Sequence, residues 1–438
     1  MWRTPGDGQP TSREWAGPAA WPKADLLEPS ASSKYIAAFD RTLEDLTVGV
    51  GRVGVSLSGG LDSSFLAAGL AVGRNLEATV LGYVHVPRVT TSQRELVARS
   101  TSELRRARLL EQRYPDRLRV KEIRSSSECL PLDAASESSR ASWLPATNPH
   151  NEVWMRQIDI QAEEDGVQLL LTGTHGNYAY SNHHAYATRY LLDQRRYVAA
   201  LTTALPTRGR AKTIRAMVRL LRTMRQPDVG GNWPGGEEYM KLIGMRPGLS
   251  LPHQPPHGTR TEYLLELADC VSGFAAQDQP GRWVVPHADP FRGRAVLETA
   301  ARIDPRVWMG RDSRVLGYRG YARLLAAGRV PDAIRLVPSP SIQGTDAWLS
   351  MKPVKDRYLD EARALRTAPE LPLWLDTGRI VALVDAWDWE SEVSPPMLEV
   401  AAVNRVLHLA DFIRTAETRL KRLAKDANGA PPPELDSG

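Results

Sequence analysis

The chain has 438 residues, 42% hydrophobic and 24% charged, the balance of a globular protein long enough to bury one or two cores. A net charge of +5 is small for this length, so a nucleic-acid partner is not expected. No apolar run reaches the roughly 18–20 residues of a membrane helix, and the first residues (MWRTPGDGQPTSREW) do not form a secretory signal. The two cysteines, Cys129 and Cys270, are too few for a zinc site or a CxxC redox pair. A cytoplasmic protein without membrane contact is therefore expected.

The N-terminal segment differs in composition from the rest of the chain. Residues 1–33 are rich in Pro, Gly, Ser and Ala, which predicts an extended tail or a strap over a neighbouring surface. Order is expected to begin near Ser33, which would cap a helix. The apolar residues of that helix share one face: Tyr35, Ile36, Phe39, Leu43 and Leu46.

Short apolar runs then alternate with amphipathic segments. Strands are predicted at residues 53–57, 79–86, 118–123 and 167–171, and helices at residues 63–72, 95–112 and 152–164. Apolar strands that alternate with helices are typical of a parallel sheet covered on both faces. We therefore expect an α/β fold with a doubly wound parallel sheet.

From about residue 186 to about residue 425 the pattern becomes mainly helical, and residues 426–438 predict a disordered tail. A basic amphipathic stretch lies at residues 208–225, followed by a Pro/Gly-rich loop at residues 227–258. The basic stretch is interpreted as the charged outer face of a helix, and a docking face for an acidic peptide or nucleic acid is the alternative.

Residues 53–64 (VGVSLSGGLDSS) carry the strongest chemical signal in the sequence. Gly59 and Gly60 allow a tight turn between an apolar strand and a helix, and the helix amides and dipole favour an anion there. Ser58 and Ser63 add hydroxyl donors, so pyrophosphate is the expected guest. Asp62 would repel phosphate alone and is interpreted as a ligand of Mg²⁺ that bridges protein and pyrophosphate. The lysine of a GxxxxGK[ST] loop is missing, which argues against transfer of a γ-phosphate.

The SGGLDS sequence resembles the pyrophosphate loop of the ATP-pyrophosphatase (PP-loop) superfamily. The chain from about residue 35 to residue 414 is similar to the synthetase domain of the asparagine synthetase family, which includes β-lactam synthetases and lasso-peptide cyclases. Further segments carry the resemblance in the family's order: residues 147–151 (TNPHN), 169–177 (LLLTGTHGN), 287–303 (HADPFRGRAVLETAARI), 330–334 (VPDAI) and 342–348 (IQGTDAW). The resemblance implies one synthetase domain over residues 34–425, with a nucleotide-binding α/β part at 34–185 and a C-terminal helical lobe at 186–425.

The resemblance also implies ATP and Mg²⁺ as cofactors and a two-step reaction. A substrate carboxylate attacks the α-phosphate to give an acyl-adenylate and pyrophosphate, and an amine then attacks the acyl carbon and releases AMP. The expected substrate is a small molecule or peptide that carries a carboxylate and an amine, with macrolactam or lactam formation expected first. The residues implied to hold pyrophosphate and metal are Ser58, Gly59, Gly60, Asp62 and Ser63, and those implied around the adenosine are Leu57, Tyr83, Thr172 and Gly173.

The sequence departs from the family pattern at functional positions. Asn177 stands where the family usually has an aspartate that helps to hold the metal; an amide oxygen can still ligate but brings no charge. The family's catalytic lysine would fall near Pro340. Arg335 and Lys352 are the expected substitutes for it, with Lys355 as a further candidate, so that Asp62, Arg335 and Lys352 form the expected catalytic set.

The amine source and competing functions stay open at this point. No segment resembles the family's glutaminase domain and Met1 is followed by Trp2, so the amine is expected from free ammonia, the substrate itself, or a partner protein that supplies the amine or delivers a peptide. A catalytically degenerate nucleotide-binding subunit or scaffold is the main alternative. A tRNA-modifying PP-loop enzyme is the other, although its thiolation members need paired cysteines. His175 would lie beside the nucleotide, whereas the adjacent His183 and His184 are interpreted as solvated.

Overall fold

The computed structural model describes residues 24–73, 79–87, 94–124, 130–142, 145–146, 148–181, 191–192, 194–198, 264, 267, 283–308, 316, 319–337, 347–367, 376–391 and 393–429. The chain divides into two compact units, one of residues 1–125, 156–236 and 251–343 and the other of residues 126–155, 237–250 and 344–438. The basic stretch at 208–225, the loop at 227–258, Cys129, Cys270, His183, His184 and Pro340 lie outside the described residues.

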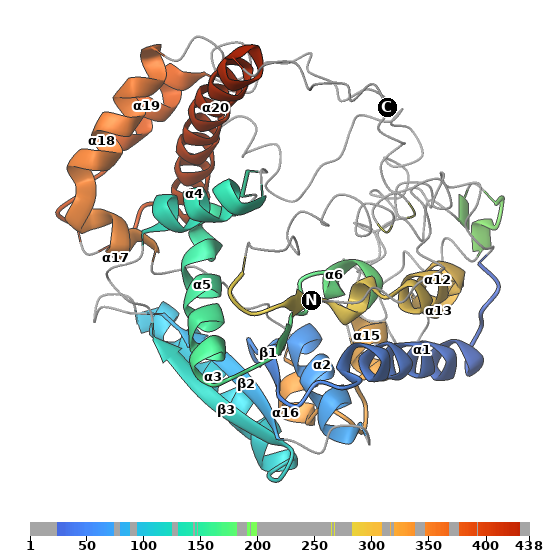
Figure 1. The fold of residues 1–438 in the computed structure, drawn as a ribbon. Coiled ribbons are helices and arrows are strands. Elements are labelled where there is room, and N and C mark those ends of the chain that lie inside the picture. The colour runs from blue at the N-terminus through green and yellow to red at the C-terminus, as the bar shows by residue number, and fades with distance from the viewer. Residues whose placement is uncertain are drawn as a thin grey trace, which may run out of the picture. The chain divides into compact units, whose positions relative to one another are not determined.

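The first unit contains a five-stranded, all-parallel sheet in the order β3-β2-β1-β4-β5. Its strands are β1 (Val53–Ser56), β2 (Val80–Val86), β3 (Leu118–Arg124), β4 (Leu169–Leu171) and β5 (His287–Ala288). Strands β1, β2 and β3 are labelled side by side in Figure 1. The predicted α/β fold with a parallel sheet is thus confirmed. The order reverses at β1, because β2 and β3 extend the sheet on one side of it and β4 and β5 on the other.

Strand β5 is not among the strands predicted from the sequence. Residues 287–303, one of the segments that carry the family resemblance, form β5, the 3₁₀ turn η2 (Pro290–Arg292) and then helix α12 (Arg294–Arg302). The strand forms because the backbone of β4 bonds to it: Leu170 N donates to Pro286 O and Thr172 N to Ala288 O, both at 2.9 Å. A strand of two residues is too short to show the apolar pattern from which a strand is predicted in a sequence.

The helices of the first unit pack on the sheet and on one another. Helix α2 packs against β1 and β2, α3 against β2 and β3, and α1 against α12. A continuous core contains Phe39, Phe65 and Phe291. The helices are α1 (Ser30–Thr47), α2 (Leu61–Val72), α3 (Arg94–Arg113), the later part of α5 (Pro149–Glu164), α6 (Gly176–Ala179), α12, α13 (Pro305–Trp308), α15 (Gly320–Leu325) and α16 (Asp332–Arg335).

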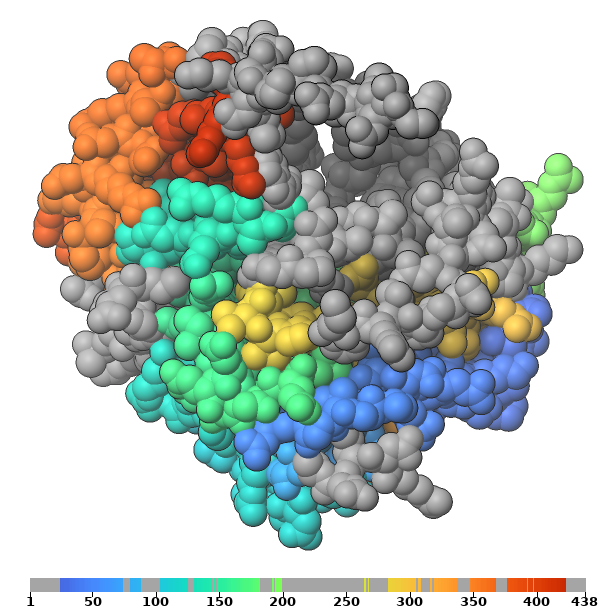
Figure 2. Space-filling view, viewed as in Figure 1, coloured from blue at the N-terminus to red at the C-terminus, as the bar shows by residue number. Residues whose placement is uncertain are grey.

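Helix α1 has the apolar face that the sequence predicts, with Tyr35, Phe39 and Leu43 buried, while its opposite face is exposed (blue in Figure 2). The helix begins at Ser30, inside the segment expected to be a tail. Order starts earlier because Leu26 is buried and bonds to the end of α12 and the residues that follow: its N donates to Arg302 O and its O accepts from Asp304 N, both at 2.9 Å.

The second unit is helical among its described residues, as the sequence pattern predicts for the C-terminal part. Its core is built around three tryptophans, with the Trp348 ring 5.6 Å from Trp387 and 4.9 Å from Trp389. Helix α4 is not among the helices predicted from the sequence, and α20 extends into the segment expected to be a disordered tail. The elements are α4 (Pro131–Ser142), the first turns of α5, α17 (Ala347–Met351), η3 (Lys352–Val354), α18 (Lys355–Ala364), η4 (Leu365–Thr367), α19 (Thr377–Ala386) and α20 (Met397–Gly429). Across the described residues, no helix has the length and apolar character to cross a membrane.

Candidate functional site

The loop between β1 and α2 has a backbone that requires glycine. Gly59 has a φ of +64°, and a Cβ at this position would lie 2.5 Å from the carbonyl oxygen of Glu103. Any other residue would therefore suffer both strain and a clash with α3. Gly60 is the N-cap of α2 and has no side chain with which to accept the first-turn amides. Those amides have no partner within the helix and are left to bind another acceptor.

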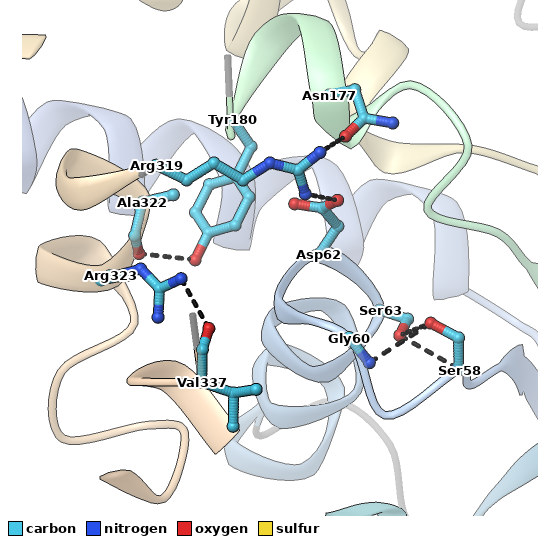
Figure 3. Close-up of polar contacts among 10 residues, drawn as sticks. All are labelled: Ser58, Gly60, Asp62, Ser63, Asn177, Tyr180, Arg319, Ala322, Arg323 and Val337. Carbon is cyan, nitrogen blue, oxygen red and sulfur yellow. Dashed lines mark hydrogen bonds and ion pairs between the residues drawn. The ribbon is translucent and has the colours of Figure 1, made fainter. Parts of the chain in front are cut away.

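The serine hydroxyls fix the shape of this loop (Figure 3). Ser63 Oγ accepts a hydrogen bond from Ser58 N at 3.1 Å and lies 3.0 Å from Ser58 Oγ. Gly60 N in turn donates to Ser58 Oγ at 3.3 Å. The side chains of Ser58 and Ser63 thus hold the turn closed around the start of α2, where the helix dipole favours an anion.

The loop after β4 packs against the same helix terminus. Positions for a Cβ on Gly173 and Gly176 would lie 3.5 Å from Ser63 N and 2.8 Å from Asp62 Cβ, respectively. Because β1 and β4 are neighbours, their carboxyl ends bring these two loops together at the reversal of strand order. In open parallel sheets, this is the place where ligands bind.

Asp62, Asn177 and Arg319 meet at this edge of the sheet (Figure 3). One terminal nitrogen of Arg319 lies 3.2 Å from Asp62 Oδ2, and the other donates to Asn177 Oδ1. The side chains of Asp62 and Arg319 are only 16% and 19% exposed, so the pair is largely shielded from water. Burial raises the pKa of Asp62 above its usual value, while the charge of Arg319 acts in the opposite direction. A further cation would therefore stabilise the ionised Asp62 carboxylate.

Arg319 was not among the residues expected from the sequence. It precedes α15 with a φ of +58°, in the left-handed region that residues other than glycine seldom adopt. Such backbone strain is common at functional sites. Helix α15 is tied to α6 by the Tyr180 hydroxyl, which donates to Ala322 O at 2.8 Å (Figure 3). Tyr180 therefore links the segment that carries Asn177 to the segment that carries Arg319.

Arg323, one turn further along α15, fixes the chain after α16. It is buried and donates to the carbonyl oxygens of Arg335 and Val337, the latter at 2.7 Å (Figure 3). Burial lowers the pKa of Arg323, and the neighbouring Arg319 charge lowers it further. Arg335 was expected to act in catalysis, but its Nε lies 2.6 Å from Asp332 Oδ1 and its Nη1 donates to Arg323 O at 3.3 Å.

The remaining expected residues lie in different surroundings. Leu57 is a core residue whose side chain packs on Gly82. The Tyr83 side chain is directed away from the loop, because its ring lies against Gly54 and its hydroxyl donates to Asp165 Oδ2 at 2.8 Å. Only the Tyr83 backbone reaches the loop, where its O accepts from Leu57 N at 2.8 Å.

Thr172 and Lys352 complete the expected set. Thr172 lies at the carboxyl end of β4, and its hydroxyl accepts a 3.5 Å hydrogen bond from Thr174 Oγ1. Lys352 belongs to the second unit, where its Nζ donates to Glu390 O at 3.3 Å. The Glu390 side chain forms an ion pair with Lys355 at 2.9 Å.

Of all the residues expected from the sequence, the structure brings together Ser58, Gly59, Gly60, Asp62, Ser63, Gly173 and Asn177.

The donors present fit a magnesium ion shared with a phosphate ligand. The Asp62 carboxylate and the Asn177 amide supply oxygen donors of the kind that magnesium prefers, and both lie beside Arg319. Magnesium is usually held by one or two carboxylates together with water and substrate phosphates. Within the described part of the chain no group of three or more His, Cys, Asp or Glu side chains could hold a metal without such a ligand.

Comparison with known proteins gives no assignment for this site. No protein-family model matches the chain, and no curated protein matches it.

Proposed function

We propose that the chain is an ATP-dependent, amide-forming synthetase that cleaves ATP between its α- and β-phosphates. The observation that carries the proposal is the convergence of three features at the carboxyl edge of β1 and β4. These are the uncapped start of α2, the largely buried Asp62 carboxylate, and the Arg319 guanidinium. Amides, a carboxylate and a guanidinium at one point suit pyrophosphate that carries a magnesium ion.

The proposed fold type follows from the same features. A five-stranded parallel sheet with its order reversing at β1, and an SGGLDS loop at that strand, support a doubly wound sheet of the ATP-pyrophosphatase type. The C-terminal helical part would be the lobe of an asparagine-synthetase-like domain. The loop, which lacks a Walker lysine, favours retention of pyrophosphate over transfer of the γ-phosphate.

In the proposed mechanism, the loop amides with Ser58 and Ser63 align the β- and γ-phosphates as the leaving pyrophosphate. The substrate carboxylate oxygen attacks the α-phosphorus, the bond to the β-phosphate oxygen breaks, and an acyl-adenylate and pyrophosphate result. An amine then attacks the acyl carbon, loses its proton, and displaces AMP. Magnesium, held by Asp62 and Asn177, would supply charge neutralisation on the phosphates.

Arg319 is the cation best placed to stabilise the charge that develops on pyrophosphate. It lies beside Asp62, whereas Arg335 is bound to Asp332 and Arg323. A guanidinium suits this role because it can donate two parallel hydrogen bonds to phosphate oxygens. Arg319 would thus take the part of the family lysine expected near Pro340.

The proposed substrate is a small molecule or peptide that carries both a carboxylate and an amine, as in lactam or macrolactam formation. Free ammonia or a partner protein that supplies the amine or delivers a peptide would serve equally in the second step. We place this reaction in the cytoplasm, where ATP is supplied. No membrane or nucleic-acid partner enters the proposal.

Product analysis tests the reaction class. The protein is incubated with Mg-ATP, a panel of amino acids and short peptides, and hydroxylamine, which traps acyl-adenylates as hydroxamates. AMP and pyrophosphate should form in equal amounts with the hydroxamate, and Asp62→Asn should form neither. Formation of ADP and phosphate would contradict the proposal.

A second candidate function is a nucleotide-binding subunit without turnover. It is favoured by one observation, that both expected metal ligands, Asp62 and Asn177, already pair with Arg319. Such a subunit would bind Mg-ATP but yield no AMP with any member of the panel.

A further inference from the structure

Arg319 occupies the space between the two side chains expected to hold the metal. Its guanidinium lies 3.2 Å from Asp62 Oδ2 and contacts Asn177 Oδ1 through its other terminal nitrogen (Figure 3). A protein cation is thus bound where a magnesium ion would neutralise the same carboxylate.

The position of Arg319 is imposed by its surroundings. Its φ of +58° is unfavourable for a residue with a side chain, so the neighbouring structure must hold it. Tyr180 supplies one restraint, since its hydroxyl fixes Ala322 O on the helix that Arg319 begins. Arg323 supplies another through its hydrogen bonds to the carbonyl oxygens of Arg335 and Val337.

We infer that Arg319 is a displaceable cation that closes the site to free metal and transfers to pyrophosphate when metal and phosphate enter together. The inference rests on the proposed function. A divalent ion alone would be repelled by the guanidinium a few ångströms away in a poorly hydrated site. Pyrophosphate between the two cations removes this repulsion, because it accepts hydrogen bonds from Arg319 and coordinates the metal.

The inference makes two opposite predictions for one substitution. In Arg319→Gln, divalent metal should bind more tightly in the absence of phosphate, because the competing positive charge is gone. Pyrophosphate should bind more weakly in the presence of metal, because a charge-assisted hydrogen-bond pair is lost. A purely structural role for Arg319 would weaken both.

Manganese is the probe, because free Mn²⁺ is measured directly by electron paramagnetic resonance. In the native protein, Mn²⁺ alone should bind weakly and pyrophosphate should tighten it strongly. Arg319→Gln should bind Mn²⁺ alone about tenfold more tightly, and should lose roughly 10–100-fold in pyrophosphate affinity at saturating Mn²⁺. Arg319→Lys keeps the charge and should still exclude free Mn²⁺.

Arg302→Gln is the matched control, since it removes one positive charge from an exposed pair with Asp25 in the same unit. It should match the native protein in both titrations. If the native protein binds Mn²⁺ alone as tightly as Arg319→Gln does, the inference is overturned while pyrophosphate binding stands. If the folded native protein binds no pyrophosphate with Mn²⁺, the proposed function fails as well.

Discussion

Asp289 binds two nitrogen donors of His175 through a single carboxylate oxygen. Its Oδ2 accepts from His175 N at 2.7 Å and from His175 Nδ1 at 2.8 Å, and both side chains are almost fully buried. Its other oxygen accepts from Phe291 N at 3.0 Å. Asp289 follows β5 and His175 belongs to the loop after β4, so this cluster ties the candidate site to the last strand of the sheet.

Asp289→Asn should destabilise the first unit. The amide has one acceptor oxygen for three donors and directs its own N–H groups at one of them. Leaving a buried donor unsatisfied costs about 1–3 kcal/mol in the free energy of unfolding, which urea titration would measure. An unchanged free energy of unfolding would show that the cluster does not hold the loop.

Gly59→Ala should abolish pyrophosphate binding. A Cβ at position 59 would lie 2.5 Å from the carbonyl oxygen of Glu103, so the turn must move. Gly49→Ala is the control for strain alone, since Gly49 has a φ of +71° and nothing within 4 Å. Calorimetry should show lost binding in Gly59→Ala but not in Gly49→Ala, and native affinity in Gly59→Ala would refute the role of this turn.

Tyr180→Phe should lower both stability and pyrophosphate affinity. It removes the 2.8 Å hydrogen bond to Ala322 O, at a cost of about 0.5–1.5 kcal/mol, while Ala322 O keeps its helical hydrogen bond from Ala326 N at 2.9 Å. Tyr35→Phe is the matched control, because the buried Tyr35 hydroxyl has no hydrogen-bond partner among the described residues. Tyr35→Phe should leave stability unchanged or raised, and equal effects of the two substitutions would contradict the positioning role of Tyr180.

The second unit should lose stability in mild acid because of His150. Burial, together with the Arg405 charge, lowers the pKa of His150 to about 4. The unfolded chain, with a His pKa near 6.5, therefore takes up a proton below that pH while the folded chain resists. The native protein should lose about 2 kcal/mol between pH 7 and pH 5 from this group alone. Urea unfolding of His150→Gln at both pH values should show that this part of the loss has disappeared.

The elements around the first strand were predictable because their signals are local. Apolar runs bounded by turns predict β1 to β4, and two glycines between a strand and a helix predict the turn after β1. Strand β5 was not predictable, since its two residues become a strand only by pairing with β4. Helix α4 was not predicted for a different reason: its serine-rich sequence is typical of a loop.

Only those residues of the candidate site that belong to a recognisable sequence motif could be predicted. The residues of the SGGLDS loop assemble as expected, and Asn177 does lie near Asp62. No sequence pattern indicated Arg319, because its position depends on a left-handed backbone conformation and on tertiary contacts rather than on residue spacing in a motif. The family resemblance implied that Tyr83 lies near the adenosine, but the direction of its ring depends on tertiary contacts with Gly54 and Asp165.

The most direct test of the central claim is calorimetric binding of Mg-ATP and Mg-pyrophosphate to the native protein and to Asp62→Asn, which keeps the size of the side chain. It requires no knowledge of the substrate. The account predicts that both ligands bind the native protein only with magnesium, that pyrophosphate competes with ATP, and that Asp62→Asn loses at least tenfold in affinity. Equal binding by the folded native and Asp62→Asn proteins, or no binding by either, would contradict a pyrophosphate site at the start of α2.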